Sequence, residues 1–326
     1  MKGKYRALLW LLPFAVFYLA FQVAPLAWVA GNSFWSDVNS RWGLDNYHDI
    51  LTSPFYLQAI RFSLDISFWS SVYGVLISLV AGYSLSQLAE SKLHRFLLAF
   101  TNMTSNFAGV PLAFAFIILL GLNGCLTLIL RRYGLAGDFR LFSRDGMVVV
   151  YTWFQIPLGV MLLLPAFDGL KKEWQESAAL LGAGRLNYWR LVALPILSPA
   201  LLGTFVILLA NALGAYATIY ALTSGNFNVV PVRIAALVSG DISLDPYMGS
   251  ALAMLLVLLL TVITVVQQYL VRRSYLNVKR SGRESLCLRL KNFITGSNVT
   301  GFWSSWRVCY WRPYFMSSPV NGAIPS

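Results

Sequence analysis

The chain has 326 residues, of which 57% are hydrophobic and only 12% are charged. Soluble domains are about 45–50% apolar and about 25% charged, so this composition excludes an ordinary soluble fold and favours a membrane protein. The net charge of +12 could indicate nucleic acid binding. Membrane proteins, however, also collect Lys and Arg on their cytoplasmic side, so we expect the bilayer and no nucleic acid as the partner.

Residues that usually build metal or catalytic centres are scarce. There are three cysteines, Cys125, Cys287 and Cys309, and two histidines, His48 and His94, which lie far apart. The cysteine spacing fits no metal motif. A histidine-based metal site and a Ser-His-Asp triad are both disfavoured by this pattern. We therefore predict no catalytic residues and no metal site.

Six apolar runs are long enough to cross a bilayer, which takes about 20 residues. They cover about residues 7–30, 60–88, 96–120, 147–167, 200–222 and 247–271. The first run is too long for the apolar part of a signal peptide and lacks a clear cleavage site, so we interpret it as a retained span. The pattern predicts an all-α, polytopic membrane protein with six transmembrane helices in residues 1–273.

The second apolar run carries small residues at helical spacing: Ser67, Ser70, Gly74, Ser78 and Gly82. Small residues let membrane helices approach each other closely. The same run holds Asp65, which we expect to pair with Arg61 four residues earlier on the same helix face.

The distribution of positive charge predicts the orientation. Six spans place both termini on one side, and most of the 25 Lys and Arg residues lie on that side. Both termini are therefore predicted to be cytoplasmic. The loop 121–146 carries four arginines on the opposite side, which favours an amphipathic segment on the membrane surface. Residues 274–326 are expected to form a polar, disordered cytoplasmic tail, either an appendage or the product of a shifted reading frame.

A charged segment, residues 168–199, separates the fourth and fifth spans. Its part from Asp168 to Trp189 can form two short helices broken near Gly182 and Gly184, because glycine permits a positive φ. Glu173 and Glu176 would fall in the first turns, where negative charge complements the helix dipole. From the residues alone, this segment is either a helical knob for a groove on a partner or an ordinary connector.

The same segment resembles the EAA loop of the membrane subunits of bacterial ATP-binding-cassette (ABC) importers. The matching residues are Glu176-Ser177-Ala178, Gly182-Ala183, Trp189, Leu194-Pro195 and Pro199. Ser177 replaces the usual Ala and is small enough to leave the helix intact. Residues 43–47, which read GLDNY, agree more weakly with a motif found early in many such permeases.

The resemblance covers about residues 5–273 and implies the type I importer permease (MetI-like) fold in a bacterial inner membrane. It implies an ATPase-coupling role for Glu176, Ala178, Ala179, Gly182, Ala183, Leu194 and Pro195. The implied partners are an ABC ATPase dimer, a second permease subunit and an external substrate-binding protein. The chain has no GxxxxGK[ST] phosphate loop, so no cofactor of its own is expected and ATP would bind to the partner.

Within this family the chain resembles the spermidine/putrescine permeases and their thiamine, ferric iron and phosphonate relatives, so a polyamine is the first expectation for the substrate. Polar residues at membrane depth either line a translocation cavity or hydrogen-bond between helices. These residues are Asn102, Asn106, Gln155, Asn211, Tyr216 and Tyr220. The best cavity candidates are Asn211, Tyr216 and Tyr220, because the resemblance places the fifth span against the pathway.

Two alternatives come from other functional classes. An ion-gradient-driven secondary transporter often shows inverted repeats and charge within the membrane. A membrane-embedded enzyme needs a cluster of titratable residues at depth. The sequence shows no clear repeat, little charge in its apolar runs and no such cluster. The preferred interpretation is therefore a non-enzymatic permease subunit that forms half of the translocation pathway.

Overall fold

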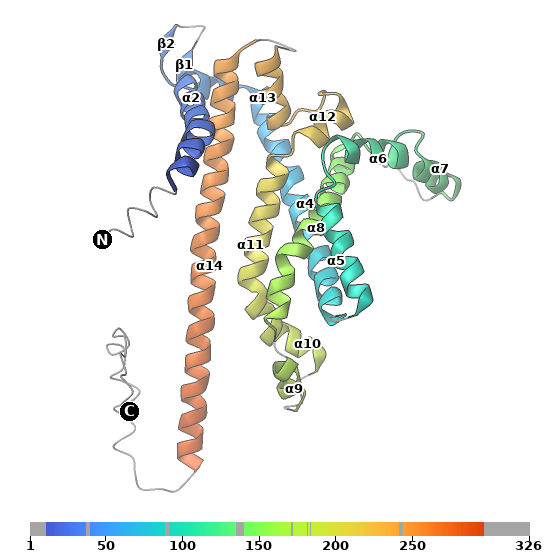
Figure 1. The fold of residues 1–326 in the computed structure, drawn as a ribbon, viewed down its shortest axis with the longest axis vertical. Coiled ribbons are helices and arrows are strands. Elements are labelled where there is room, and N and C mark those ends of the chain that lie inside the picture. The colour runs from blue at the N-terminus through green and yellow to red at the C-terminus, as the bar shows by residue number, and fades with distance from the viewer. Residues whose placement is uncertain are drawn as a thin grey trace. The chain divides into compact units, whose positions relative to one another are not determined.

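The computed structural model describes residues 11–36, 40–88, 91–134, 140–170, 172–180, 182, 184–240 and 244–296. By its internal contacts the chain divides into two units, 1–274 and 275–326. Within the described ranges the secondary structure is almost entirely helical (Figure 1). The one sheet among these residues is a two-stranded antiparallel ribbon in which Trp35 pairs with Trp42.

The first half of the chain starts with a helix over 11–32 that contains a π-helical turn, η1. The labelled elements of this half, of which the first two belong to that helix, are η1 (Leu19–Val23), α2 (Ala24–Asn32), β1 (Trp35–Ser36), β2 (Arg41–Trp42), α3 (Asp45–Thr52), α4 (Pro54–Gln87), α5 (Lys92–Ser105), α6 (Val110–Leu120), α7 (Cys125–Arg132) and α8 (Arg144–Asp168). Asn46 of the GLDNY segment is buried, and its Nδ2 donates to the Trp35 carbonyl at 2.8 Å.

The second half runs from the charged loop to the long last helix. Its elements are α9 (Lys172–Leu180), α10 (Arg185–Tyr188), η2 (Trp189–Ala193), α11 (Leu194–Leu213), α12 (Ala217–Thr223), α13 (Val230–Ser239) and α14 (Pro246–Gly296). Helix α14 continues past Arg273, where the sixth span was expected to stop, and its backbone is helical to Gly296. The remainder of the expected tail, 297–326, lies outside the described residues.

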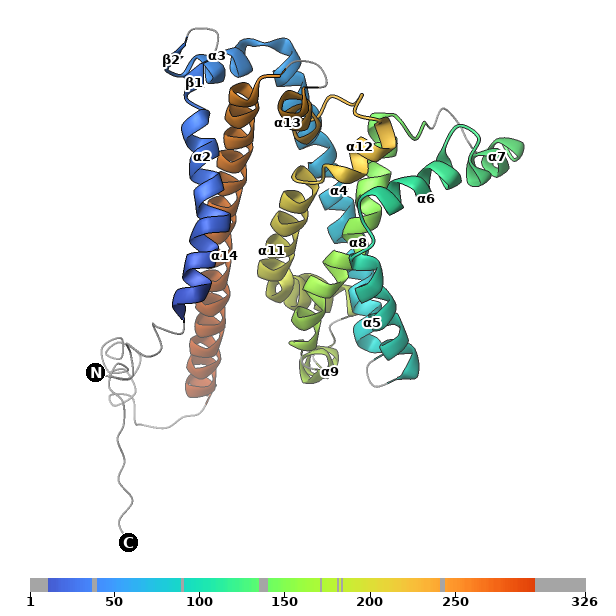
Figure 2. The ribbon, with the colours of Figure 1, turned by 45° about the horizontal axis from the view of Figure 1, so that its top comes forward.

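Within the described parts of the chain, six segments are long and apolar enough to span a membrane, which agrees with the predicted number. They are Leu11–Asn32, Pro54–Gln87, Val110–Arg132, Arg144–Asp168, Leu186–Leu213 and Pro246–Val271. Helices α4 and α8 form the most extensive helix pair, with α11 and α5 packed beside them (Figures 1 and 2). The largest core cluster joins Ile66 of α4, Met147 and Phe154 of α8, Leu112 of α6 and Ile219 of α12.

The α4–α8 contact depends on small and polar residues, as the serine and glycine pattern predicted. A Cβ on Gly74 would lie 3.2 Å from the Cβ of Gln155, and a Cβ on Gly159 would lie 2.9 Å from the Cβ of Ser78. The Ser78 hydroxyl donates to the Ile156 carbonyl at 2.9 Å. The two backbones approach so closely that no larger residue fits at either glycine without movement.

The expected third span, 96–120, was wrong as a continuous helix. The chain breaks between Ser105 and Val110, where Gly109 adopts a φ of +75°, and Pro111 lies in the first turn of α6, which starts at Val110. Helix α5 packs along α8, whereas α6 runs across the direction of α4 and α8 in both views (Figures 1 and 2). Glycine allows the left-handed backbone that turns the chain here.

The expected fifth span, 200–222, was also placed too late. Helix α11 ends at Leu213, and α12 starts at Ala217 after a short break. This break meets the one before α6: the Gly109 amide donates to the Thr218 hydroxyl at 2.9 Å, and the Tyr151 hydroxyl donates to the Ala215 carbonyl at 2.8 Å. Backbone groups freed by broken membrane helices need such partners, so a side chain of α12 satisfies the first break and a side chain of α8 satisfies the second.

Candidate functional site

The segment 168–199 forms two short helices, α9 and α10, as predicted. The Ser177 hydroxyl donates to the Glu173 carbonyl at 2.6 Å, so the residue that replaces the usual Ala is accommodated within the helix. Helix α9 ends at Leu180, and Gly182 follows with a φ of +76°, its amide donating to the Ala179 carbonyl at 2.9 Å. Ala183, another of the predicted coupling residues, lies outside the described residues.

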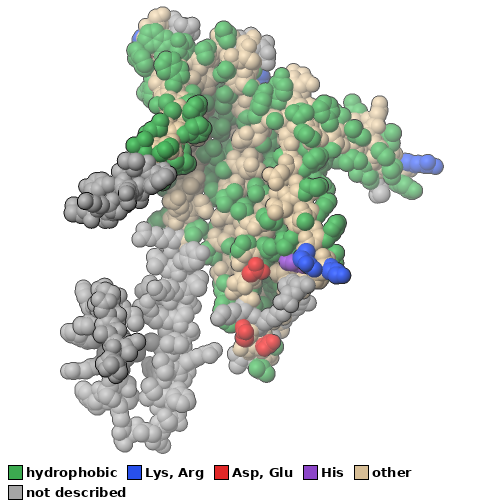
Figure 3. Space-filling view, in the orientation of Figure 1, with side chains coloured by type: hydrophobic (Ala, Val, Ile, Leu, Met, Phe, Trp, Pro, Cys, Tyr) green, Lys and Arg blue, Asp and Glu red, His purple; other side chains and the backbone are tan. Residues whose placement is uncertain are grey.

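The surface of this loop combines acidic and apolar side chains. Leu180 is 89% exposed and Leu186 is 80% exposed. Glu173 and Glu176 are exposed on α9, as is Ala179, whereas Ala178 is half-buried. In Figure 3, acidic side chains (red) and apolar side chains (green) lie together at the lower end of the coloured part of the molecule. Both leucines expose most of their side chains, and Leu180 lies four residues after Glu176 on α9, so the described part of the loop presents apolar and acidic groups together.

Aromatic side chains fix the base of the loop against the ends of α4 and α8. The Tyr83 ring lies 4.7 Å from the Trp189 ring and 6.1 Å from the Phe167 ring, measured between centroids. Leu163, Phe167 and Leu197 form a buried cluster at the same place. Predicted residues Leu194 and Pro195 begin α11 directly after this anchor. The loop is therefore rigidly joined to the core although its tip is exposed.

A cavity of about 520 Å³ lies between the loop and the ends of the core helices. Its lining includes Tyr83 and Gln87 from α4, Asp168 from α8, Glu176 from α9 and Trp189 from η2. Two carboxylates therefore face one partly apolar space. The sequence indicated the acidic residues but not this cavity, because it forms between segments that are far apart in the chain.

The predicted cavity residues Asn211, Tyr216 and Tyr220 gather around the break between α11 and α12. Asn211 is exposed near the end of α11, and Tyr216 stands at the start of α12. The rings of Tyr216 and Tyr220 lie 5.1 Å apart. Polar groups beside a broken helix can line a water-filled space. Their part in a translocation pathway stays a prediction.

Gln155 has the interhelical role that was the alternative to lining a cavity. It is fully buried, its Nε2 donates to the Ser70 hydroxyl at 2.8 Å, and its Oε1 accepts from the Ser71 hydroxyl at 3.1 Å. Asn102 and Asn106 are exposed instead, and the Asn106 side chain donates to the Asn102 carbonyl at 3.0 Å. The two asparagines thus stabilise the end of α5 at its break.

Asp65 pairs with Arg144 rather than with Arg61, so the predicted local pair was wrong. The Arg144 guanidinium donates to both oxygens of Asp65, with Nη2 at 2.9 Å from Oδ1, and also to Asp145. Arg144 is the first residue of α8 and lies 79 positions from Asp65. The acidic partners offset a positive charge at a helix N-terminus, where it is otherwise unfavourable.

Arg233 was not singled out from the sequence, yet it is almost completely buried. Its Nε donates to the Asn228 side chain at 2.9 Å, and its guanidinium lies 5.0 Å from the centre of the Phe55 ring. Burial lowers the pKa of this guanidinium from its ordinary value. Arg233 thereby ties α13 to the start of α4. A cation–π contact between distant segments leaves no local signal in the sequence.

The six candidate spans among the described residues define a helical multi-pass membrane protein, and the comparisons with known proteins identify its family. Residues 74–274, more than half of the chain, match the family described as the binding-protein-dependent transport system inner membrane component. The chain belongs to this family. It is a multi-pass inner-membrane permease subunit of an ABC importer, and not an enzyme or an ion-gradient-driven carrier.

Curated relatives span most of the chain at low identity. The sn-glycerol-3-phosphate transport system permease protein UgpA of Pectobacterium atrosepticum is 25% identical over 267 residues, covering 76% of this chain and 88% of that protein. The sulfate transport system permease protein CysT of Salmonella typhimurium is 26% identical over 176 residues, covering 53% and 61%. These names do not support the polyamine expectation.

Solved structures confirm the type I importer permease fold. A bacterial ABC transporter involved in the import of the acidic polysaccharide alginate has a TM-score of 0.67 at 18% identity, covering 83% of this chain and 96% of that chain. The MetNI methionine ABC transporter has a TM-score of 0.51 at 19% identity, covering 67% and 95%. A bacterial alginate transporter is also known in complex with its alginate pentasaccharide-bound periplasmic protein.

Proposed function

We propose that this permease forms half of a translocation pathway and docks a separate ABC ATPase through the α9–α10 loop. The observation that carries the proposal is the exposed tip, where Leu180 and Leu186 are almost fully exposed and α9 also exposes the carboxylates of Glu173 and Glu176. A short amphipathic helix inserted into a groove is an established recognition mode. Glu176, Ala178, Ala179, Gly182, Ala183, Leu194 and Pro195 are the proposed coupling residues.

The anchor of the loop supports a mechanical role. Tyr83 contacts both Trp189 of the loop and Phe167 at the end of α8. Helix α11 starts at Leu194, immediately after η2. A displacement of α9 by the closing ATPase would therefore be transmitted to α4, α8 and α11 together. Packed cores transmit such shifts because they do not deform continuously.

The proposed assembly contains an ATPase dimer, a second permease subunit and a substrate-binding protein on the outside. Both termini and the α9–α10 loop would face the cytoplasm, in accord with the excess of Lys and Arg on that side. The pathway would be lined in part by Asn211, Tyr216 and Tyr220, which lie around the break between α11 and α12. ATP would bind only to the partner, because the chain carries no phosphate-binding loop.

For the substrate we propose a small anionic solute in place of a polyamine. The named relatives transport glycerol-3-phosphate and sulfate. Aspartates on the outer side were the residues compatible with a cation, but Asp45 pairs with Arg41 and Asp65 pairs with Arg144. A paired carboxylate attracts a cation weakly, because the neighbouring guanidinium already compensates its charge.

Affinity purification of the importer from mild detergent tests the docking loop. The wild type should recover an ABC ATPase, and Glu176→Arg should lose it, because the variant places a positive charge where the loop offers a negative one. Asp49→Arg, at a position on α3 that is also exposed, is the matched control and should retain the ATPase. Recovery of equal ATPase with Glu176→Arg would overturn the proposed role of Glu176.

The same preparation identifies the substrate class. Its co-purified binding protein is titrated with sulfate, sn-glycerol-3-phosphate and spermidine, and heat of binding is measured. Binding of either anion would support the anionic class. Binding of spermidine alone would overturn it and restore the polyamine.

A further inference from the structure

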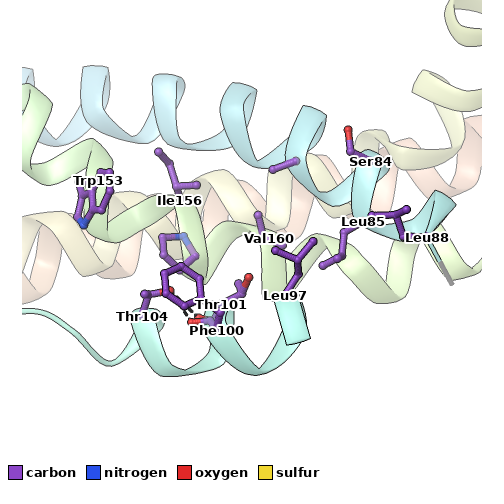
Figure 4. A pocket seen from close by; sticks show the side chains of 12 residues that line it. Ser84, Leu85, Leu88, Leu97, Phe100, Thr101, Thr104, Trp153, Ile156 and Val160 are labelled. Atoms are coloured by element: carbon purple, nitrogen blue, oxygen red, sulfur yellow. Dashed lines mark hydrogen bonds between the residues drawn. The ribbon is translucent and has the colours of Figure 1, made fainter. Parts of the chain in front are cut away.

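A second cavity, distinct from the one beside the loop, lies among α4, α5 and α8. It has a volume of about 300 Å³, and the 12 side chains that line it carry no charge (Figure 4). Leu85 and Leu88 lie at one end and Trp153 at the other, with Leu97 and Phe100 of α5 along one side. We call it the α5 groove.

Two of the hydroxyls that line the groove are already satisfied within their own helices. The Ser84 hydroxyl donates to the Val80 carbonyl at 2.9 Å, and the Thr104 hydroxyl donates to the Phe100 carbonyl at 2.9 Å. Water needs several polar partners to occupy a cavity, and a polar solute needs donors or acceptors that fix it. The α5 groove therefore suits an apolar occupant, and an empty groove would forfeit dispersion contacts along its walls.

The rim of the groove is open to the surroundings of the helices. Phe100 is 52% exposed and Trp153 is 53% exposed, although both line the cavity. Trp153 belongs to α8, one of the candidate membrane spans, and Phe100 belongs to α5, which packs along α8. In a bilayer, an apolar rim of this kind contacts the acyl chains of lipids.

Basic residues stand at the end of the groove. Lys92 and Arg95 are exposed in the first turn of α5, which contains no acidic residue. The His94 ring contacts the carbonyl of Leu85, a groove residue, at 3.0 Å. Figure 3 shows blue and purple atoms gathered over the start of α5. Positive charge beside an apolar groove complements the phosphate of an anionic lipid.

We propose that the α5 groove is a binding site for one anionic phospholipid. The acyl chain lies between α4, α5 and α8, and the phosphate lies against Lys92 and Arg95. The proposed orientation, with both termini in the cytoplasm, places this lipid in the inner leaflet. The site itself does not depend on ATPase docking, so its failure and the failure of the α9–α10 loop are separately measurable.

Photolabelling of the assembled importer in nanodiscs tests the site. The nanodiscs contain phosphatidylcholine with a small fraction of phosphatidylglycerol whose acyl chain carries a diazirine, and labelled residues are found by peptide mass spectrometry. We expect the label to concentrate on Phe100, Thr104 and Trp153. A phosphatidylcholine probe with the same diazirine should label these residues much less.

Two pairs of variants separate the acyl chain from the phosphate. Ala81→Phe fills the groove from α4, whereas Val80→Phe adds the same ring at a position that is 67% exposed and outside the groove. Lys92→Gln with Arg95→Gln removes the basic turn, whereas Arg131→Gln with Arg132→Gln removes two arginines of α7. We expect labelling to fall about fivefold per charge lost from α5 and to be abolished by Ala81→Phe, with both controls unchanged.

Three results would overturn the proposal. The first is a label spread evenly over exposed apolar residues, and the second is equal labelling by the two lipids. The third is labelling of the isolated chain that disappears in the assembled importer, which would assign the groove to a side chain of the second permease subunit.

Discussion

The α4–α8 interface and the α9–α10 loop are joined by a single helix, α8, yet they follow opposite rules. At the interface, Gly159 packs against Ser78, and Gln155 is fully buried with its side-chain amide hydrogen-bonded. In the loop, Leu180 and Leu186 are almost fully exposed. The interface uses small and polar residues where hydrophobic ones are expected, and the loop exposes hydrophobic residues where polar ones are expected.

The difference separates residues that hold the fold together from residues for which we propose a contact with a partner. Membrane helices gain little from burying apolar side chains against each other, because lipid is equally apolar, so their contacts depend on close approach and hydrogen bonds. The loop lies at the end of the spanning helices, and its exposed leucines contribute little to folding. Substitutions in the interface should therefore lower stability, and substitutions in the loop should lower coupling alone.

The largest effect is expected for Leu180→Asp. The change places a charge where we propose that a groove of the ATPase accepts an apolar side chain, so capture of the ATPase and substrate-stimulated ATP hydrolysis should both fall to background. The melting temperature of the purified permease should stay that of the wild type, because surface substitutions typically change stability by about 0.5 kcal/mol or less.

Leu244→Asp is the matched control for this substitution. Leu244 is 73% exposed and precedes α14, far in sequence from the loop. The control should retain both ATPase capture and stimulated hydrolysis. Equal loss in the two variants would show that an added carboxylate harms the assembly in general, and it would contradict a specific role for Leu180.

Gly159→Ala tests the interface and should have the next largest effect. The new methyl would overlap the Ser78 hydroxyl and lie 2.9 Å from the Ser78 Cβ. Overpacking of this kind costs about 1–3 kcal/mol, which should appear as a lower melting temperature in detergent. Gly203→Ala in α11 should change little, because its methyl would meet only the Gln267 side chain at 3.5 Å.

A second substitution can distinguish steric overlap from an unspecific effect. In a Ser78→Gly background the space opposite Gly159 is open, so Gly159→Ala should then cost much less than it does in the wild type. An unchanged cost in that background would exclude the contact with Ser78 as the cause.

The sequence predicted the class, the number of spans and the two helices of the loop, because each depends on local composition. Apolar runs, and the glycines Gly182 and Gly184, determine the backbone conformation within a few residues of their own positions. The two breaks were missed for the same reason: residues 106–109 and 214–216 are short interruptions in apolar stretches, and a span estimate averages over about 20 residues. The break before α6 is completed by the hydroxyl of Thr218, which is distant in the sequence.

Long-range partners were the second kind of feature that the sequence did not predict. The i, i+4 rule selected Arg61 for Asp65, whereas the fold brings Arg144 from another helix. The cavity beside Glu176 and the α5 groove likewise form between segments that only the fold brings together. The sequence therefore singled out the loop for which we propose a coupling role, but not the surfaces that surround it.

Gln155→Leu should have the smallest effect of these substitutions. It distinguishes the contribution of the polar contacts between α4 and α8 from that of the close approach of their backbones. The substitution removes both hydrogen bonds between Gln155 and α4, but the hydroxyls of Ser70 and Ser71 still donate to the Ser67 carbonyl. No buried hydroxyl loses its last partner, so the cost should be that of an interhelical hydrogen bond, about 1 kcal/mol or less. The drop in melting temperature should be smaller than for Gly159→Ala, with ATPase capture unchanged. A larger loss of stability, or any loss of capture, would show that the polar contacts rather than the close approach of the backbones hold α4 against α8.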